Sequence, residues 1–460
     1  MNHQHHTHEL EPDRGRVRSR RRWWAVGLAG MTGLALTTTV GVAAIPAAGA
    51  VARTLTTTGD HPEKPSLGDH RGKSDGDKGE AKRETKPKGI PVPCDPDRLI
   101  AEINLANARG GATLDLAKKC AYTLTADIDG AGLPAITTPI TLNGSKHTTI
   151  TRAAAAEPFR ILNVNVNGRL TLNHLTITGG QPAPGGQGGG ILVNPGGGAT
   201  INHSRVVRNI SGNNGGGVAN LGGSLEIRNS TVGHNTAAIT GGGVVSAGKL
   251  VVDKSRFDAN TASAAGGIGV SGVLRITRSE IVNHRAGTGG GMFIFAATGT
   301  ISDTRFERNT TTDVGGAAIG GGPLQLTLSR VTIANNTATS GLGFGALFLQ
   351  GGTALVEDSV IRDNIGTNGG GIRNLGTLTL IRTKVTGNQA TGSGGGVFNE
   401  FIGRLALFAT HITKNTAGSD GGGIVNQAGG IVDLNTATAT GTVVVRNRPN
   451  NCVNVIGCPG

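Results

Sequence analysis

A glycine-rich repeat of about 25 residues constrains this chain more than any other feature. Each unit reads [ST]-x-[VFI]-x-x-N, a short polar stretch, Gly-Gly-[GA], an apolar residue, a Gly-containing turn and L-x-[LIV]. Its Ser or Thr falls at positions 204, 230, 255, 279, 304, 329, 359, 383 and 410. With 78 glycines and 3% aromatic residues in 460, the chain is poorly suited to one compact core. It is suited to a repeat fold, in which each unit packs on its neighbours.

Apolar and polar residues alternate within the unit, as in Leu225-Glu226-Ile227 and Leu378-Thr379-Leu380. This period of two indicates strands, and the glycines divide each unit into three short extended pieces. Three strands per unit predict an all-β fold, a right-handed parallel β-helix in which each strand pairs with its copy about 4.8 Å away. The region from about residue 114 to 445 has room for about thirteen coils.

The N-terminal region indicates export. Arg20-Arg21-Arg22 precede an apolar stretch that ends in Ala48-Gly49-Ala50, which predicts a signal peptide over residues 1–50. The arginines also fit a twin-arginine signal, and an uncleaved anchor is the alternative. Residues 51–90 are rich in Lys, Asp, Glu, Gly and Pro, which predicts a disordered linker. We expect a secreted or cell-wall-associated domain at 91–460, with no membrane span in the mature chain.

The ends of this domain carry their own signals. Residues 97–109 predict an amphipathic helix with Asp97 as N-cap and Gly110-Gly111 as the stop, placed to cover the first coil. Cys94, Cys120, Cys452 and Cys458 lie near the two ends. Bonds between sequence neighbours, which would close the first coil and the C-terminal tail, are favoured among three pairings, with a metal site as the rival.

Several motifs carry a resemblance to known families. The Gly-Gly-[GA]-[IV] and F-x-x-N motifs, the latter at Phe257–Asn260 and Phe306–Asn309, resemble the repeats of chlamydial polymorphic outer-membrane proteins. Residues 92–460 are similar to secreted right-handed parallel β-helix repeat proteins of high-GC Gram-positive bacteria, in the pectin-lyase-like superfamily; Leu170–Gly180 and Arg448–Cys452 carry this resemblance. It implies a fold and an extracellular location, and no activity.

Asparagine recurs at the end of the [ST]-x-[VFI]-x-x-N motif. The column contains Asn209, Asn235, Asn260, Asn309, Asn336, Asn364, Asn388 and Asn415, with His284 in one coil. Stacked Asn side chains can hydrogen-bond along the stack, so we interpret the column as a structural ladder and His284 as a tolerated substitution. The Gly-Gly-Gly segments lack a following Gly-Lys-Ser/Thr and are interpreted as turns, not phosphate loops.

A basic column follows the Ser or Thr of the repeat. It contains Arg205, Arg256, Arg305, Arg330, Lys384 and His411, and strand alternation should direct it away from the core. Two interpretations stay open: a solvated face that discourages strand pairing, and a track for an anionic polysaccharide.

A second column follows each glycine triplet by two residues and includes Phe293, Phe348 and Phe398. If it faces outward, it forms an aromatic stripe for sugar rings or a protein partner. If it faces inward or packs under a loop, it is part of the core.

Enzymes of the pectin-lyase-like fold need clustered carboxylates, with calcium in the lyases. The nearest candidates are Glu357, Asp358 and Asp363, and alternation should scatter them over different faces. Signatures such as Asn-Thr-Asp and Gly-His-Gly are missing. We therefore leave the catalytic residues unassigned and expect calcium only if the protein is a lyase, with no other cofactor or metal.

The net charge of the full chain is +13. Residues 91–460 contain 28 cationic and 20 anionic residues. Without a concentrated Lys/Arg run, this charge argues against nucleic acid and is compatible with an envelope glycan or with solvation alone. The sequence favours a monomeric, exported binding or display protein that contacts polysaccharide. A polysaccharide lyase or hydrolase and a purely structural surface protein are the alternatives.

Overall fold

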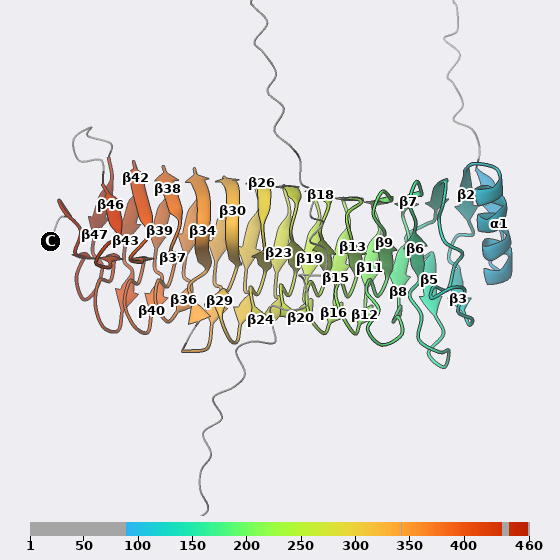
Figure 1. The fold of residues 1–460 in the computed structure, drawn as a ribbon, viewed down its shortest axis with the longest axis horizontal. Coiled ribbons are helices and arrows are strands. Elements are labelled where there is room, and N and C mark those ends of the chain that lie inside the picture. Colours follow the sequence, from blue (N-terminus) through green and yellow to red (C-terminus); the bar gives the residue numbers. More distant parts are fainter. Residues whose placement is uncertain (1–88, 342, 435–440, 459–460) are drawn as a thin grey trace, which may run out of the picture. The chain divides into compact units, whose positions relative to one another are not determined.

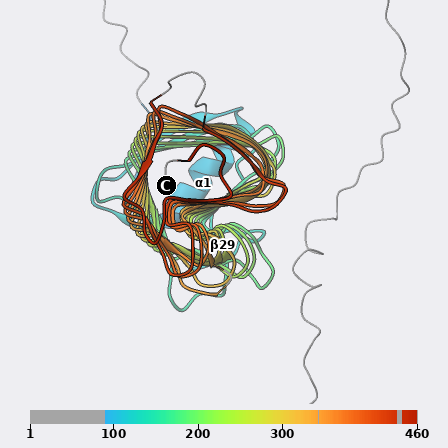
Figure 2. The ribbon, with the colours of Figure 1, turned by 90° about the vertical axis from the view of Figure 1, so that its left-hand side faces the viewer.

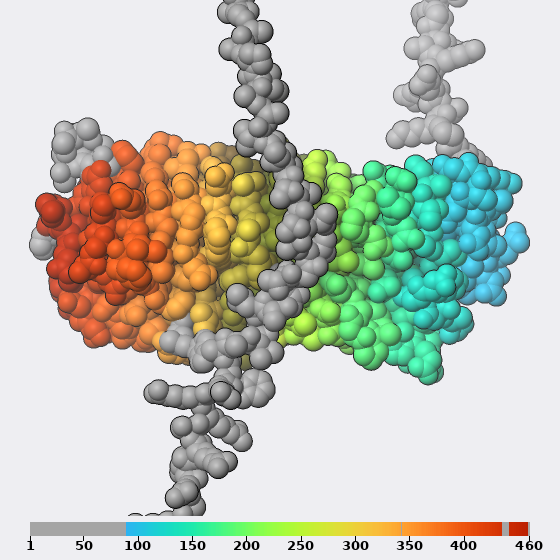
Figure 3. Space-filling model, in the orientation of Figure 1, coloured from blue at the N-terminus to red at the C-terminus, as the bar shows by residue number. Residues whose placement is uncertain are grey.

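The computed structural model describes residues 89–341, 343–434 and 441–458. The signal peptide expected at 1–50, and all but the last two residues of the linker expected at 51–90, lie outside them. The described residues form a parallel β-helix whose coils follow one another as one continuous stack (Figures 1 and 3). The fold class expected from the repeat is confirmed.

One coil from the middle shows how the repeat folds. Its strands are β13 (Val218–Asn220), β14 (Ser224–Arg228), β15 (Thr231–Gly233) and β16 (Thr236–Ala237). Leu225 and Ile227 of β14 are buried, as the alternation requires. Each such coil has four strand segments instead of the expected three. The chain bends between β15 and β16. His234, with φ of +55°, and Asn235 lie at this bend and separate the two-residue strand β16 from β15.

Equivalent strands of successive coils pair in parallel and give four stacks, numbered in chain order within a coil. Stack 1 runs from β6 (Leu162–Val164) to β48 (Cys452–Val453), and stack 4 from β12 (Ile210–Ser211) to β44 (Thr416–Ala417). Stack 2 contains β1 (Ile90–Val92), β2 (Ala112–Leu116), β4 (Pro139–Asn143), β7 (Arg169–Asn173), β10 (Gly198–Asn202), β14, β18 (Lys249–Asp253), β22 (Val273–Thr277), β26 (Ala297–Ser302), β30 (Ile319–Ser329), β34 (Leu347–Glu357), β38 (Thr377–Ile381), β42 (Arg404–Phe408) and β46 (Ile431–Asp433). Stack 3 contains β3 (Ala121–Leu124), β5 (Thr149–Arg152), β8 (Thr176–Thr178), β11 (Arg205–Val207), β15, β19 (Arg256–Asp258), β23 (Glu280–Val282), β27 (Arg305–Glu307), β31 (Thr332–Ala334), β35 (Val360–Arg362), β39 (Lys384–Thr386), β43 (His411–Thr413) and β47 (Val443–Val445).

The register places like residues above one another. Leu225 pairs with Leu250, and Leu250 with Leu274. Within the described residues, stacks 1 and 2 merge into one 24-stranded sheet, whereas stack 3 is a separate 13-stranded sheet and stack 4 a 9-stranded one. The two longest strands, β30 and β34, run through both stack 1 and stack 2. The core is therefore a continuous apolar column enclosed by the sheets.

A helix covers the N-terminal end of this core. Helix α1 (Pro96–Ala108) buries Leu99, Ile103 and Ala106, and the view along the coils shows it lying across their interior (Figure 2). The expected N-cap was wrong by two residues. Asp95, in extended conformation, caps the helix by accepting from the backbone N–H groups of Asp97 and Arg98, and a proline follows it at the first helical position.

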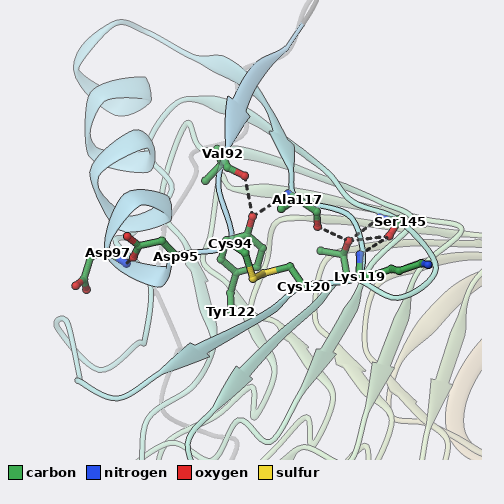
Figure 4. Close-up of a disulfide and its surroundings, with 10 residues drawn as sticks. Val92, Cys94, Asp95, Asp97, Ala117, Lys119, Cys120, Tyr122 and Ser145 are labelled. Atoms are coloured by element: carbon green, nitrogen blue, oxygen red, sulfur yellow. Dashed lines mark hydrogen bonds between the residues drawn. A yellow bond between two sulfur atoms is a disulfide. The ribbon is translucent and has the colours of Figure 1, made fainter.

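The two disulfides pair sequence neighbours, Cys94 with Cys120 and Cys452 with Cys458. The first joins the segment before α1 to the first coil, beside Tyr122, whose hydroxyl donates to the carbonyl of Val92 at 3.0 Å (Figure 4). At the other end, Cys452 and Cys458 pack against the core together with Val455. Both ends of the core thus have a disulfide beside them, and stable disulfides are typical of proteins in oxidising compartments.

Candidate functional site

The asparagine column forms a buried ladder along the bend between stacks 3 and 4. Asn235 Nδ2 donates to Asn260 Oδ1 at 3.0 Å, and the same contact recurs at 2.9–3.0 Å between the other consecutive Asn pairs. Asn447 continues the ladder after Asn415. Each of these side chains is buried and also satisfies backbone groups, so the column supports the fold and offers no free amide to a ligand.

His284 interrupts this ladder. Its Nδ1 accepts from the backbone N–H of Asn260 at 3.0 Å, and its own backbone N–H donates to Asn309 Oδ1. The ring is fully buried, and Nε2 has no hydrogen bond of normal geometry among the described residues. Burial lowers the pKa of His284 to about 4, outweighing the opposing effect of the charge of Asp258.

Five members of the basic column lie where alternation places them, at the first position of stack 3 strands: Arg205, Arg256, Arg305, Lys384 and His411. Glu280 lies between Arg256 and Arg305 in the register and forms ion pairs with both, that with Arg305 at 2.6 Å. Two of these five side chains are therefore neutralised by the intervening carboxylate, which does not favour a continuous track for an anionic polysaccharide.

Arg330 does not belong to that column. Arg305 pairs with Thr332 of the next coil. The residues just before them, Thr304 and Val331, are therefore aligned with each other, and Ser329 is not aligned with Thr304. The sequence motif was shifted by two residues here, because Val331 replaces the usual Ser or Thr while Ser329 stands close by. Arg330 lies instead in the turn between stacks 2 and 3, with φ of +52°.

Opposite charges alternate along this turn. Arg330 donates to both carboxylate oxygens of Asp303 at 2.7 and 2.9 Å, and Arg382 to those of Asp358 at 2.6 and 2.8 Å. The Arg382 hydrogen bond lowers the pKa of Asp358, and the Arg330 hydrogen bond does the same for Asp303. These groups are exposed, so we assign them a small stabilising role.

The three candidate carboxylates are not gathered into one site. Glu357 ends β34, Asp358 lies in the turn that follows, and Asp363 lies beyond β35 in the next turn, where it pairs with Arg362 at 2.7 Å. A strand of stack 3 thus separates Asp363 from Asp358. The arrangement offers no pair of facing carboxyl groups for acid and base catalysis.

The phenylalanine column does not form an exposed stripe. Phe348 and Phe398 are both 6% exposed, and Phe293 is half-buried. Between Phe348 and Phe398 in the register lies Arg373, whose guanidinium packs 3.5 Å from the ring centroid of Phe344 and forms an ion pair with buried Glu400. Phe348 and Phe398 pack beside this cation–π and ion-pair cluster, which leaves little of their aromatic surface for a sugar.

A hollow surface lies on the outer face of stack 2. Three depressions adjoin one another on this face: the second, of about 530 Å³, crosses β14, β18 and β22, whereas the first and third, of about 590 and 520 Å³, lie side by side over β26, β30 and β34. Val273 lines the first and second, whereas Thr298, Gln325 and Thr353 line the first and third. We call this continuous surface the outer groove. Six strands at about 4.8 Å spacing give it a length of about 24 Å.

The two ends of the outer groove differ in charge. The N-terminal depression is lined by four cationic side chains, Arg228, Lys249, Arg275 and Arg278, and by two carboxylates, Glu226 and Asp253. Arg228 pairs with Glu226 and Arg278 with Asp253, whereas Lys249 and Arg275 have no ion-pair partner within the described residues. The rest of the groove is lined by uncharged residues.

Asp253 in the groove is not suited to proton donation. Burial raises the pKa of Asp253, but hydrogen bonds from Thr277 and Arg278 outweigh it and hold the pKa below its ordinary value. An acid catalyst needs a raised pKa. The outer groove can therefore offer hydroxyl, amide and cationic groups to a ligand, together with the apolar surface of Val273 and Leu355.

The outer groove was not among the features predicted from the sequence, although a signal was present. Thr298-Gly-Thr300 places two threonines at alternate positions of a stack 2 strand, where they face outward and line the groove. In the described ranges, no three or more His, Cys, Asp or Glu side chains converge on a metal position. No helix within those ranges has the length and apolar character of a membrane span.

No family model matches the chain, and no curated protein matches it. Among solved structures, the chain is similar to the A-module of the mannuronan C-5 epimerase AlgE6 of Azotobacter vinelandii, at 13% sequence identity. The match covers 76% of this chain and 94% of the other, with a TM-score of 0.29. At that TM-score the similarity carries no argument; the strand pairing alone establishes the fold.

Proposed function

We propose that the outer groove binds an extended polysaccharide, and that the protein is an exported binding or display protein. The observation that carries this proposal is the continuity of the three depressions along stack 2. A groove that crosses six equivalent strands offers contacts at the regular spacing of the coils, which suits an extended ligand made of repeated units. A compact small molecule would need a single deeper pocket.

The lining supports a sugar ligand. Threonine hydroxyls and the Gln325 amide can exchange hydrogen bonds with sugar hydroxyls, while Val273, 58% exposed, offers an apolar contact. The unpaired cations Lys249 and Arg275 at one end favour a polymer with carboxylate or sulfate groups. We therefore propose an acidic glycan of an envelope or matrix as the ligand.

The chemistry of the groove favours binding over cleavage. Glu226 and Asp253 are held in ion pairs, and Asp253 keeps a lowered pKa. A lyase or hydrolase would need a free carboxyl or cationic base beside a bound metal or an acid partner. This balance supports a role in which the glycan is held and released unchanged.

A blocking variant tests the site. Gln325→Trp places a bulky side chain in the middle of the outer groove, and Gln389→Trp places one on exposed strand β40 (Gln389–Ala390), outside it. Affinity electrophoresis of the full chain through gels with acidic or neutral glycans should show retardation that Gln325→Trp abolishes and Gln389→Trp leaves intact. Equal retardation of the unchanged chain and both variants would refute binding in the outer groove. New reducing or unsaturated ends on the glycan would show that the protein cleaves its ligand.

A further inference from the structure

The outer face of stack 4 carries threonine at recurring positions. This stack contains β12, β16, β20 (Thr261–Ala264), β24 (Arg285–Thr288), β28 (Thr310–Thr311), β32 (Thr337–Ala338), β36 (Ile365–Gly366), β40 and β44, which follow one another along one edge of the solenoid (Figure 1). The register aligns the first residues of these strands, so that Thr236 lies beside Thr261 and Thr310 beside Thr337. Because side chains alternate, the next outward position comes two residues after the first.

Two columns of hydroxyl groups result. The first column contains Thr236, Thr261, Thr310, Thr337 and Thr416, and the second contains Ser263, Thr312, Thr339, Thr367 and Thr391. Successive coils are about 4.8 Å apart, and the columns are about 7 Å apart, which is the advance of two residues along a strand. The outward positions of both columns lie in the described ranges, and Arg285 is the one charged residue among them. The face is therefore a two-dimensional array of hydroxyl groups with almost no charge.

The hydroxyl groups of the second column are held in place by the backbone. Ser263 donates to the carbonyl of Ala238, and Thr367 to that of Ser340, both at 2.7 Å and both across to the preceding coil. The threonine hydroxyls of the first column have no hydrogen-bond partner among the described residues. Since threonine is restricted at χ1, these hydroxyls take few positions and are free to bind a ligand.

The inner side of stack 4 holds the array rigid. Its inward position is a buried alanine in six of the nine strands. The glycine triplets of the repeat lie directly behind these strands: a Cβ at Gly242 would lie 2.5 Å from the carbonyl oxygen of Thr261. A Cβ at Gly395 would lie equally close to the carbonyl oxygen of Thr416. Backbone therefore packs on backbone, with no long side chain between the two layers that could change its conformation and shift the strands.

We propose that this face binds the surface of ice. Threonine offers a methyl group and a hydroxyl group side by side, and Ile210 and Ile365, which are 46% and 38% exposed, add apolar surface in the first column. Oxygen atoms in ice form a regular lattice, and one of its repeats is close to the coil spacing of about 4.8 Å. Hydroxyls held at that spacing can therefore contact the lattice at many points, and a rigid array loses little conformational entropy on binding.

The absence of aromatic residues favours ice over the flat surface of a crystalline glycan. Sugar rings pack well on the faces of aromatic side chains, and the outward positions of stack 4, all within the described ranges, contain no Phe, Tyr or Trp. The array also lies on a different stack from the outer groove, so this proposal does not depend on glycan binding.

Ice-affinity partitioning of the full chain tests the face. Ice is grown slowly from a dilute solution, and the protein concentration in the ice is compared with that in the remaining liquid. The proposal predicts that the unchanged chain enters the ice and that Thr337→Tyr, which raises a bulky ring in the middle of the array, is excluded from it. The matched variant Thr377→Tyr alters an exposed threonine of stack 2 and should enter the ice like the unchanged chain.

Exclusion of the unchanged chain from ice would overturn the proposal, and so would equal uptake of Thr337→Tyr and the unchanged chain. Thermal unfolding followed by circular dichroism shows whether the variants fold, and Thr391→Tyr, at an exposed position of the second column, replaces Thr337→Tyr if that variant does not. Gln325→Trp separates this face from the outer groove, because it should lose glycan retardation and keep ice uptake. Loss of ice uptake in Gln325→Trp would place ice binding on stack 2 and contradict the proposal.

Discussion

The backbone N–H of Asn260 donates to Nδ1 of His284 at 3.0 Å, at the one ladder position between Asn209 and Asn415 where the side chain is not Asn. The acceptor role of the ladder is kept, but the amide N–H₂ group that neighbouring asparagines use to reach the next coil is lost. A ring that can take up a proton is thereby placed in a buried site, where a charge is costly. This substitution makes the middle of the solenoid sensitive to acid.

Acid should destabilise the protein through His284. Its pKa is lowered from 6.5 in the unfolded chain to about 4 in the fold, so protonation favours unfolding. The stability it contributes is complete above pH 6.5 and falls as the pH drops toward 4, by at most about 3 kcal/mol. His284→Asn should remove this component, seen in denaturant midpoints at pH 4.5 and 7. An unchanged pH dependence in the variant would contradict the assignment.

Loss of a ladder asparagine should lower the free energy of unfolding at neutral pH by more than the replacement of His284 does. Asn336 Nδ2 donates to the carbonyls of Phe306 and Ala334 and to Asn364 Oδ1, and its Oδ1 accepts from Asn309. Asn336→Ala leaves several buried groups unsatisfied and should lower the free energy of unfolding by about 3 kcal/mol or more. Thermal unfolding followed by circular dichroism measures this, with exposed Gln389→Ala as the control. A shift as small as that of the control would show that the ladder is dispensable.

The two disulfides should contribute unequally. Cys94 and Cys120 are 26 residues apart, whereas Cys452 and Cys458 are 6 apart. A disulfide restricts the unfolded chain more when it closes a longer loop. The free energy of unfolding should therefore fall by about 3.5 kcal/mol for Cys94→Ser with Cys120→Ser and by about 2 kcal/mol for the C-terminal pair. Denaturant unfolding of the two double variants tests the order, and the reverse order would indicate that native packing at the C-terminal end dominates.

Asp358 should be dispensable for glycan retention. Its carboxylate is exposed, paired with Arg382, and has a lowered pKa. We expect Asp358→Asn to leave retardation in glycan gels unchanged and to reduce stability slightly at low salt, with the loss disappearing at high salt. Loss of retention in this variant would return the carboxylates near β34 to the candidate site.

The sequence predicted the repeat, the parallel strands, the terminal helix and the asparagine column because each depends on local pattern. Alternation fixes which face a residue takes, and period fixes its partner in the next coil. It failed at Arg330, where Val331 replaces the usual Ser or Thr and a nearby Ser shifts the motif. It also could not decide the phenylalanine column, because the burial of Phe348 and Phe398 depends on a cluster around Arg373 and Phe344 from other coils.

The outer groove was missed for a related reason. Coil lengths vary from 24 residues, between Ile90 and Leu114, to 32, between His411 and Val443. Whether outward side chains leave a depression between them also depends on the sizes of the side chains in neighbouring coils, which the sequence pattern of one coil does not show.

The most direct test of the account measures glycan affinity after removal of the unpaired groove cations. Lys249→Ala with Arg275→Ala should weaken binding of an acidic glycan to the full chain at least about tenfold at low salt. The matched pair Arg205→Ala with Lys384→Ala removes two cations from stack 3 and should change affinity little. Titration calorimetry of the three proteins against one glycan decides between them. A selective loss in the groove variant is the predicted result, and equal affinities, or a larger loss in the stack 3 variant, would contradict the outer groove as the binding site.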